Sequence, residues 1–259
     1  MKHDAMRRVT AVANQKGGVG KTTTSINLAA SLAVLDKRVL LIDLDAQGNA
    51  TTGLGIDKKA VGLGSYDILI NNVPLHEAMM PTSCEGLVIV PASMDLAGAE
   101  VELVAIEKRE RVLERTLSEY AGTPLDYVFI DCPPALNLIT LNALTAADRV
   151  LIPLQSEFYA MEGLTQLMDT IRRVRASLNP NLNMEGILLT MVDRRNNLSV
   201  QVEEEVRNYF GAQVYEASIP RNVRLSEAPS FGVPAMYHDV RSLGAQAYLQ
   251  LAQEMIRRG

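Results

Sequence analysis

Two lysines, three glycines and two threonines are concentrated in one short run, Asn14-Gln15-Lys16-Gly17-Gly18-Val19-Gly20-Lys21-Thr22-Thr23. Glycines let a backbone wrap closely around a phosphate chain, because they lack the Cβ that would collide with it. In such a loop Lys21 would reach the β- and γ-phosphates, and the Thr22 hydroxyl would take one position on Mg²⁺. The run therefore predicts a polyphosphate-binding loop.

The neighbours of this loop are the ones that a phosphate site requires. We expect an apolar strand over Val9–Ala13 before it and an amphipathic helix from Thr22 to about Leu35 after it. The free N–H groups at the start of that helix, with the positive end of its dipole, would hold the anion. Strand, loop and helix together favour this interpretation over a glycine-rich turn with a solvated lysine.

The loop differs from the common pattern G-x-x-x-x-G-K-[ST], because Gln15 stands at the first glycine and a second lysine, Lys16, follows it. The form K-G-G-x-G-K-T resembles the deviant Walker A motif of the ParA/MinD group of P-loop ATPases. The resemblance implies a P-loop NTPase fold with ATP or ADP and Mg²⁺ as cofactors. It also implies that Lys16 reaches the phosphates of the neighbouring subunit in a dimer, as an arginine finger does.

Composition narrows the class of protein further. Of the 259 residues, 47% are hydrophobic and 21% are charged, which is enough for one large α/β domain. No apolar run reaches the roughly 18–20 residues that span a bilayer, and no signal-peptide core follows the N-terminus. We therefore expect a cytoplasmic protein. Its net charge of −5 excludes an overall basic surface but permits a local basic patch.

Short apolar runs alternate with helical patterns along the chain. The expected strands are Val9–Ala13, Val39–Asp43, Leu87–Pro91, Tyr127–Asp131, Val150–Leu154, Gly186–Val192 and a weaker Gln213–Ile219. The expected helices include a long one at about Leu96–Tyr120 and a C-terminal one within Val240–Gly259. This alternation predicts a doubly wound, mostly parallel sheet with helices on both faces. We expect a single domain over residues 1–259, with residues 1–8 as a flexible N-terminal extension.

Three carboxylates follow the expected strands at the edge that carries the loop. Alternation directs Asp43 and Asp45 to opposite sides, so the two have different roles. The resemblance assigns Asp45 to the attacking water and Asp43 to the outer shell of Mg²⁺. Asp131, in the run Tyr127-Val128-Phe129-Ile130-Asp131-Cys132-Pro133-Pro134, is the Walker B candidate for the same metal. The stretch from Ala46 to Gly55 resembles a switch segment that reorganises when the γ-phosphate leaves.

The second half of the chain has two segments that resemble the chromosomal ParA (Soj) branch of this group, Thr190–Leu198 and Ile219–Ser230. The resemblance implies that Arg195 and Arg224 bind duplex DNA without sequence preference. It also implies that Met191 and the turn Pro220-Arg221-Asn222 lie near the adenine. Charge alone favours another interpretation, in which these arginines pair with Asp193 or Glu227 on the surface. A row of arginines on one expected helix is a secondary candidate: Arg172, Arg173 and Arg175.

Three other functions remain open. A membrane-bound MinD-type ATPase needs a C-terminal helix with a basic face, whereas here the basic residues lie mainly at the ends of the tail. An ATP-driven iron–sulfur reductase needs two suitably placed cysteines, and Cys84 and Cys132 lie in unrelated segments. A non-catalytic nucleotide-binding module is disfavoured by the intact Lys21, Thr22, Asp45 and Asp131.

The resemblance extends from about Val9 to the C-terminus and implies a ParA/Soj-like partitioning ATPase. In this interpretation ATP drives a homodimer that binds non-specific double-stranded DNA and is therefore nucleoid-associated. A ParB-like centromere-binding protein then stimulates hydrolysis and release. No catalytic arginine or glutamine is evident in the sequence, so hydrolysis is expected to be slow without that partner. No stable membrane association is expected.

Overall fold

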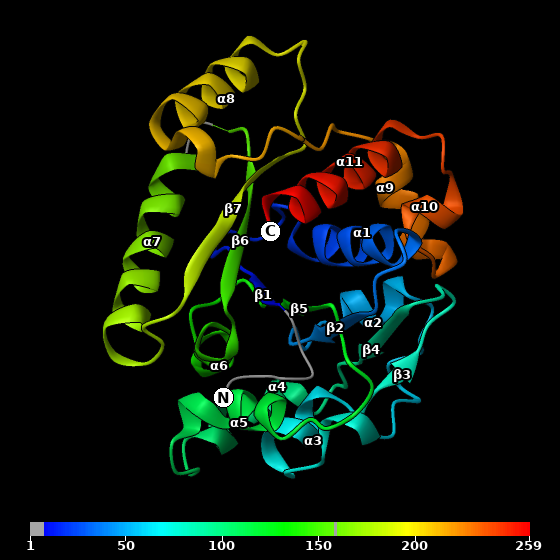
Figure 1. Cartoon of the computed structure of the whole chain (residues 1–259), viewed down its shortest axis with the longest axis vertical. Helices are drawn as coiled ribbons and strands as arrows, with labels where there is room; N and C mark the ends of the chain where they lie inside the picture. Colours follow the sequence, from blue (N-terminus) through cyan, green and yellow to red (C-terminus); the bar gives the residue numbers. More distant parts are fainter. Residues whose placement is uncertain (1–7, 158–159) are drawn as a thin grey trace.

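Runs of branched apolar residues form the strands of one seven-stranded sheet, in the order β3-β4-β2-β5-β1-β6-β7 (Figure 1). The computed structural model describes residues 8–157 and 160–259, with the backbone alone described for residues 160–162. Neighbouring strands are parallel except β3, which pairs with β4 in the antiparallel sense. The strands are β1 Val9–Val12, β2 Val39–Asp43, β3 Met80–Pro81, β4 Leu87–Val90, β5 Tyr127–Asp131, β6 Arg149–Gln155 and β7 Asn183–Thr190.

The predicted fold class is confirmed, and six of the predicted strands lie within one to three residues of their observed bounds. The weaker strand expected over Gln213–Ile219 is wrong. That segment makes one isolated bridge, Val214 with Ile187, and its amides at Tyr215 and Ile219 donate to carbonyls of β7 without forming a continuous ladder. The amides of Glu216 and Ala217 donate instead to the carboxylate of Glu254, both at 2.9 Å. A side chain therefore takes the hydrogen bonds that a neighbouring strand would need.

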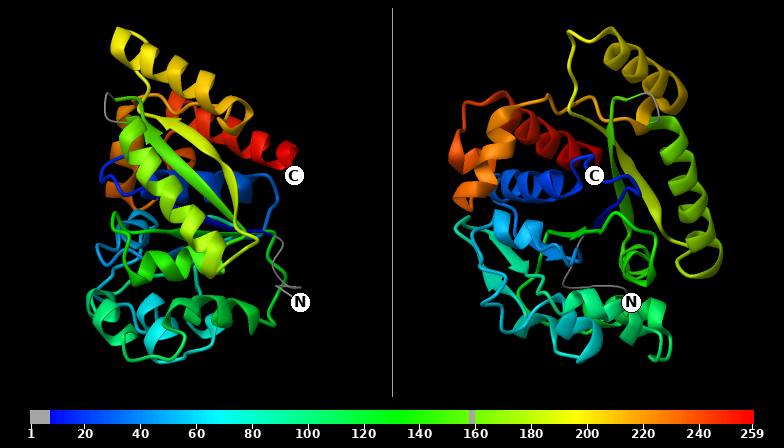
Figure 2. Two further views of the ribbon diagram at one scale, coloured as in Figure 1. Left: turned by 90° about the vertical axis from the view of Figure 1, so that its left-hand side faces the viewer. Right: turned by 180° about the vertical axis from the view of Figure 1, so that it is seen from behind.

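Helices cover both faces of the sheet, as Figures 1 and 2 show. One hydrophobic core lies between the sheet and the helices on the face of α1 and α11. The other hydrophobic core lies between the opposite face of the sheet and helices α3 to α8. The helices are α1 Lys21–Val34, α2 Asn49–Gly53, α3 Ser65–Ile70, α4 Leu96–Leu103, α5 Val112–Ser118, α6 Leu138–Ala146, α7 Ala160–Ser177, α8 Asn197–Phe210, α9 Val223–Glu227, α10 Ala235–His238 and α11 Leu243–Arg258. Short 3₁₀ turns are η1 Leu75–Glu77, η2 Arg109–Arg111, η3 Gly211–Gln213 and η4 Ala228–Phe231.

The single long helix expected at about Leu96–Tyr120 is wrong, because α4 and α5 are separate helices with η2 between them. Lys108 has a left-handed φ of 54°, which no helix can continue through. Asn142 of α6 then fixes the break from outside: its amide donates to the Arg109 carbonyl at 2.7 Å and accepts from the Leu113 amide at 3.1 Å. The apolar spacing is maintained across the break, which explains why periodicity did not reveal it.

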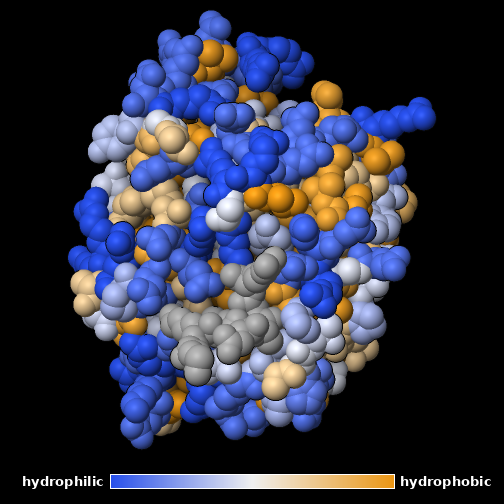
Figure 3. All heavy atoms as spheres, in the orientation of Figure 1, coloured by the Kyte–Doolittle hydropathy of each residue, from blue (hydrophilic) through white to orange (hydrophobic). Residues whose placement is uncertain are grey.

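The C-terminal helix α11 packs on α1 and fills the core through Leu251, Ala252 and Met255. The first residue of the helix, Leu243, lies outside this packed face and is 71% exposed. Figure 3 shows a mainly hydrophilic face with apolar side chains gathered over α1. Among the residues that the structure describes, no helix combines the length and apolar character needed to cross a bilayer.

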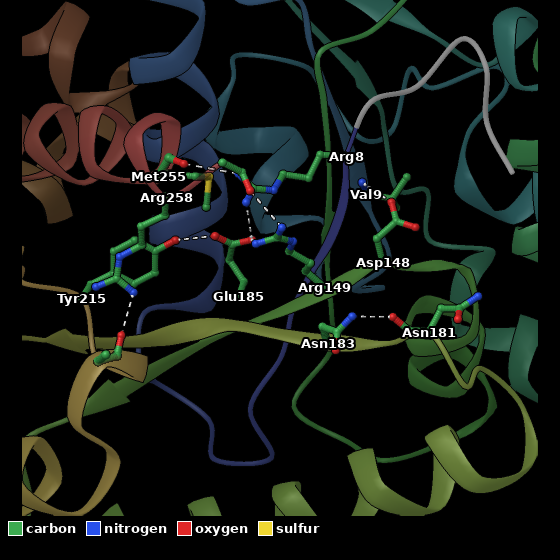
Figure 4. Close-up of polar contacts among 12 residues, drawn as sticks. Arg8, Val9, Asp148, Arg149, Asn181, Asn183, Glu185, Tyr215, Met255 and Arg258 are labelled. Atoms are coloured by element: carbon green, nitrogen blue, oxygen red, sulfur yellow. Dashed lines mark hydrogen bonds and ion pairs between the residues drawn. The ribbon is translucent and has the colours of Figure 1, made fainter.

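A buried ionic network joins the start of the sheet to α11 (Figure 4). Glu185 of β7 has no exposed side-chain area and lies 3.2 Å from Arg8 Nη2 and 3.4 Å from Arg149 Nη1. The hydroxyl of Tyr215 donates to its other oxygen at 2.6 Å, and Arg8 Nη1 donates to the Met255 carbonyl at 3.3 Å. Arg8 is thus fixed in the core, which corrects its assignment to the flexible extension; the rest of that segment lies outside the described residues.

We expect Glu185→Ala to lower the free energy of unfolding by about 3–5 kcal/mol, because it leaves a buried arginine without its carboxylate. Urea denaturation followed by circular dichroism measures the change. Glu204→Ala is the control, since this α8 carboxylate is exposed and its loss should cost less than about 0.5 kcal/mol. Equal stabilities for the two variants would contradict a stabilising role for the network.

Candidate nucleotide-binding site

The loop between β1 and α1 is shaped for an anion. Gly18 and Gly20 have φ angles of 74° and 87°, in the left-handed region that other residues rarely adopt. Among the described residues, none accepts a hydrogen bond from the amide groups of residues 17–23; the first amide to be paired is that of Thr24, which donates to the Gly20 carbonyl at 2.8 Å. The loop therefore presents unpaired donors at the N-terminus of α1.

Lys21 lies inside the loop. The residue is 7% exposed, and its ammonium donates to the Lys16 carbonyl at 2.9 Å. Burial lowers the pKa of Lys21, and the nearby Asp131 carboxylate opposes this effect. A phosphate oxygen in place of the carbonyl would give the buried ammonium an anionic partner, which is the stronger kind of hydrogen bond.

Asp43 and Asp131 end the adjacent strands β2 and β5 as direct partners in the register, and both are fully buried. Burial raises the pKa of each carboxyl above its ordinary value, and the neighbouring Asp43 carboxylate raises that of Asp131 further. Such a pair is costly to ionise unless a cation lies beside it. The site thus favours a bound cation.

The two carboxylates differ in the hydrogen bonds that they accept within the protein. Asp43 accepts from the Asp45 amide at 3.1 Å and from the Thr51 amide and hydroxyl at 2.9 and 2.7 Å. Asp131 accepts from the Ser25 hydroxyl at 2.8 Å through Oδ1. Its Oδ2 is buried and has no hydrogen bond of good geometry, although the Thr22 hydroxyl is close enough to lower the pKa. Thr22 and Asp131 therefore fit Mg²⁺ better than Asp43, whose oxygens are used within the protein.

Asp45 is outside the strand and half-exposed. Its Oδ1 accepts from the Gln47 amide at 3.0 Å, so the side chain fixes the turn that leads into α2. Asp43 is buried while Asp45, which lies beyond the strand end, remains accessible. Residues two apart in a strand point to the same face, so the expectation that alternation separates these two carboxylates is wrong. Their environments differ because the strand ends at Asp43. The segment after Asp45 includes the short helix α2 and ends at Gly55, where a Cβ would lie 2.9 Å from the Gly232 carbonyl.

Lys16 contacts a residue that the sequence analysis did not identify. Its ammonium lies 2.7 Å from Glu157 Oε2, in the loop after β6, and both side chains are almost half exposed. Gln155 donates to the other oxygen of Glu157 at 2.5 Å. No pattern in the sequence indicated that Glu157 would pair with Lys16.

The residues expected near the adenine lie at the phosphate loop or beside the strand end that contacts it. The Thr190 hydroxyl donates to the Val19 carbonyl at 2.9 Å, and the terminal methyl of Met191 would be 3.9 Å from a Cβ at Gly20. The turn at Pro220–Asn222 lies beside this strand end, because the Arg221 amide donates to the Val192 carbonyl at 3.1 Å. The two segments singled out in the second half of the chain are therefore neighbours in the fold.

Both candidate DNA-binding arginines form surface ion pairs. Arg195 binds Asp193 through two nitrogens at 2.9 and 3.0 Å, and this pair lowers the pKa of Asp193 to about 2. Arg224 lies 2.7 Å from Glu227 and 3.5 Å from Asp239. Such exposed pairs contribute about 0–1 kcal/mol, so a phosphate could replace either carboxylate at small cost. In the secondary row, Arg172 pairs with Asp169 at 2.6 Å.

The cysteines do not support an iron–sulfur cluster. Cys84 and Cys132 are both buried, and they belong to the cores on opposite faces of the sheet. Burial raises the pKa of the Cys132 thiol, which keeps it protonated. Within the described ranges, no group of three or more histidine, cysteine, aspartate or glutamate side chains is arranged to hold a metal. This excludes a cluster shared by the two cysteines of one chain.

We expect Lys21→Ala to weaken binding of ADP with Mg²⁺ at least about tenfold. A hydrogen bond to a charged group contributes about 1.5–3 kcal/mol, and 1.4 kcal/mol corresponds to tenfold. Titration with a fluorescent ADP analogue measures the affinity. Lys37→Ala is the matched control. Lys37 follows α1 and lines a hollow with Arg8 and Arg149 at the N-terminal ends of the strands, opposite the loop. Unchanged binding by Lys21→Ala would remove the loop lysine from the phosphate site.

Comparisons with known proteins agree with this site. A family model described as an AAA domain matches residues 7–184. The chain is 56% identical over 252 residues to the chromosome partitioning protein ParA of Caulobacter vibrioides, covering 97% of this chain and 94% of that protein. It is 54% identical over 254 residues to the sporulation initiation inhibitor protein Soj of Bacillus subtilis, covering 98% and 100% of the two chains.

The fold is also similar to that of a solved structure with a bound nucleotide. It is described as cobyrinic acid a,c-diamide synthase from Mycobacterium smegmatis with bound ADP and magnesium. Its TM-score is 0.85 at 40% identity, covering 98% of this chain and 95% of that one. Identity to the partitioning proteins is higher, and the matched regions cover nearly the whole of this chain. This chain therefore belongs to the ParA/Soj family of chromosome-partitioning ATPases.

Proposed function

We propose that this chain is a DNA-segregation ATPase whose ATP-bound dimer binds double-stranded DNA without sequence preference. Hydrolysis stimulated by a ParB-like protein then releases the DNA. The observation that carries the proposal is the conjunction at one sheet edge of unpaired loop amides, the buried Lys21 and the unpartnered Oδ2 of Asp131. Membership of the partitioning family supplies the biological setting.

The chain's own residues divide the work of phosphoryl transfer. The loop amides and Lys21 would bind the phosphates, while Thr22 and Asp131 would hold Mg²⁺ and Asp43 would support its outer shell. When bound, the metal neutralises charge on the β- and γ-phosphates. Asp45 has an accessible carboxylate beside the loop and would orient the attacking water. Met191 and Pro220–Asn222 would border the adenine, since Met191 lies against the loop and the turn lies beside the strand end that carries Met191.

Lys16 would complete the site of a second subunit. In a single chain its ammonium is paired with Glu157 rather than directed to its own loop. The pair is exposed, so breaking it costs about 1 kcal/mol or less. A triphosphate in a neighbouring subunit offers more negative charge than one carboxylate. Dimerisation would therefore replace Glu157 with phosphate oxygens as the partner of the Lys16 ammonium. The ammonium and the phosphate would be removed from water together, and only when ATP is present.

The DNA surface would be built from Arg195 and Arg224. On binding, each arginine would exchange its carboxylate partner, Asp193 or Glu227, for a phosphate of the duplex. Few cations per subunit give weak, salt-sensitive binding, and two subunits acting together raise the effective affinity. DNA retention would thus depend on the dimer. Because duplex DNA is polyanionic, the overall net charge of −5 makes a confined basic surface necessary.

A partner is needed because the site lacks a further cation. Within the described residues, no arginine forms a hydrogen bond or ion pair with the loop or with Asp43, Asp45 or Asp131. Hydrolysis would consequently be slow until another protein supplies charge or improves the geometry. A MinD-like membrane role is less well supported, since α11 packs its apolar face on α1 and buries Leu251 and Met255.

Lys16→Ala should reduce the ATP-dependent dimer much more than it reduces ADP binding by the monomer, because the lysine acts on the other subunit's phosphates. Analytical ultracentrifugation with Mg²⁺ and a non-hydrolysable ATP analogue measures the dimer, and ADP titration measures the monomer site. Glu157→Gln is the companion variant and should favour the dimer slightly, since it frees Lys16. Equal losses of dimer and ADP binding in Lys16→Ala would mean that Lys16 acts only within its own chain.

The proposed function predicts DNA retention with ATP and its absence with ADP or without nucleotide. Arg195→Glu and Arg224→Glu should each lower retention at least tenfold while leaving the dimer intact, because they reverse charge at the phosphate contacts. Biolayer interferometry on a duplex of arbitrary sequence measures retention. Arg38→Glu is the matched control, because Arg38 is exposed and precedes β2, apart from both arginine segments. Retention that is independent of nucleotide would refute the switch, and normal retention by both variants would move the DNA surface elsewhere.

A further inference from the structure

Helix α4 has apolar side chains on two opposite faces. One face is fully buried against the sheet and consists of Leu96, Ala99 and Leu103. The exposed apolar residues follow the other face at three- and four-residue spacings and form what we name the α4 stripe: Met94, Ala97, Val101 and Val104. Val101 is 77% exposed, Met94 65% and Val104 56%. A helix that is apolar on both sides has a second packing surface, and none of the residues that the structure describes covers it.

The surroundings of the stripe are acidic. Residues 94–107 contain four acidic side chains and no lysine or arginine, and all four are exposed: Asp95, Glu100, Glu102 and Glu107. By helical periodicity Glu100 lies on one side of the stripe and Glu102 on the other. An apolar line bordered by carboxylates is complementary to an amphipathic helix whose apolar face is bordered by lysine or arginine.

The stripe is connected to the buried carboxylate Asp43. The Thr51 hydroxyl donates to Asp43 Oδ2 at 2.7 Å and accepts from the Ala92 amide at 2.8 Å. Ala92 begins the turn that leads from β4 through Met94 into α4. A change at Asp43 or in the segment that carries Thr51 therefore acts directly on the start of the stripe.

A second connection comes from the loop that follows Asp131. Asn137 ends that loop, caps α6 through the Thr140 amide and donates to Glu100 Oε2 of α4 at 2.9 Å. Leu136, beside it, is 38% exposed. One of the two loops that would respond to the γ-phosphate and the metal thus contacts α4 itself, and the other contacts the turn that leads into it. The outer face of α4 is therefore placed where nucleotide state can be sensed.

We propose that the α4 stripe is the docking surface for a basic amphipathic helix of a partner protein, which thereby couples to the nucleotide site. Charge selects this occupant: a second copy of the chain would place four carboxylates against four, and nucleic acid or an anionic membrane would be repelled. The coupling to hydrolysis, though not the docking itself, rests on the proposed function.

Val101→Glu and Val104→Glu test the surface, because both side chains are exposed and their replacement leaves the core unchanged. The probes are the ParB-like protein of the same organism and a labelled peptide of its N-terminal segment. Fluorescence anisotropy should give at least tenfold weaker peptide binding, and the partner should no longer stimulate hydrolysis, while basal hydrolysis is unchanged. Tyr209→Glu on α8 is the control, since Tyr209 is 75% exposed. Glu107→Lys should weaken peptide binding several-fold.

Unchanged peptide affinity and unchanged stimulation in both valine variants would overturn the proposal. Loss of the ATP-dependent dimer in Val101→Glu without any partner would also overturn it, by assigning the stripe to a second copy. The DNA retention of the wild-type protein is measured in parallel. If that retention does not depend on ATP, the proposed function fails, whereas the anisotropy result still decides whether a basic helix docks on α4.

Discussion

The side-by-side burial of Asp43 and Asp131 is the constraint on which the site depends. Parallel pairing of β2 with β5 brings the two carboxylates to the same height, and burial raises the pKa of both. Ser25 of α1 holds one, and Thr51 after β2 holds the other. A cation at the N-terminus of α1 would relieve their mutual repulsion. The loop, the helix dipole and the unpaired amides supply the matching anion site, so metal and phosphate stabilise each other.

The same arrangement connects the site to the rest of the surface. Thr51 and Asn137 extend the influence of the two strand ends to α4, while the end of the α2 segment packs Gly55 against Gly232 near α9. These contacts are hydrogen bonds and close backbone approaches, which are either made or broken. A small shift at the phosphates would therefore switch them between two arrangements. In the proposed function, one nucleotide site would therefore act on two surfaces, a basic one that includes Arg224 and an acidic one on α4.

Ion pairs within the single chain give these surfaces their dependence on partners. Lys16 pairs with Glu157, Arg195 with Asp193 and Arg224 with Glu227. Each pair is exposed and weak, so each cation can be transferred to a phosphate at little cost. The buried network around Glu185 behaves differently, because its charges have no access to water and serve to join β7 to α11.

The sequence by itself determined the phosphate loop, the main strands and the carboxylates at their ends, because local patterning and a contiguous motif encode them. It also indicated the segments that carry Met191, Arg195 and Arg224. Tertiary structure alone decided where the long apolar pattern after Leu96 breaks, since Asn142 of another helix stabilises the break. Tertiary contacts also prevent residues 213–219 from forming a strand and pair Lys16 with Glu157. Among the described residues, they leave one face of α4 uncovered. These features are contacts between residues far apart in the chain, and no local periodicity records them.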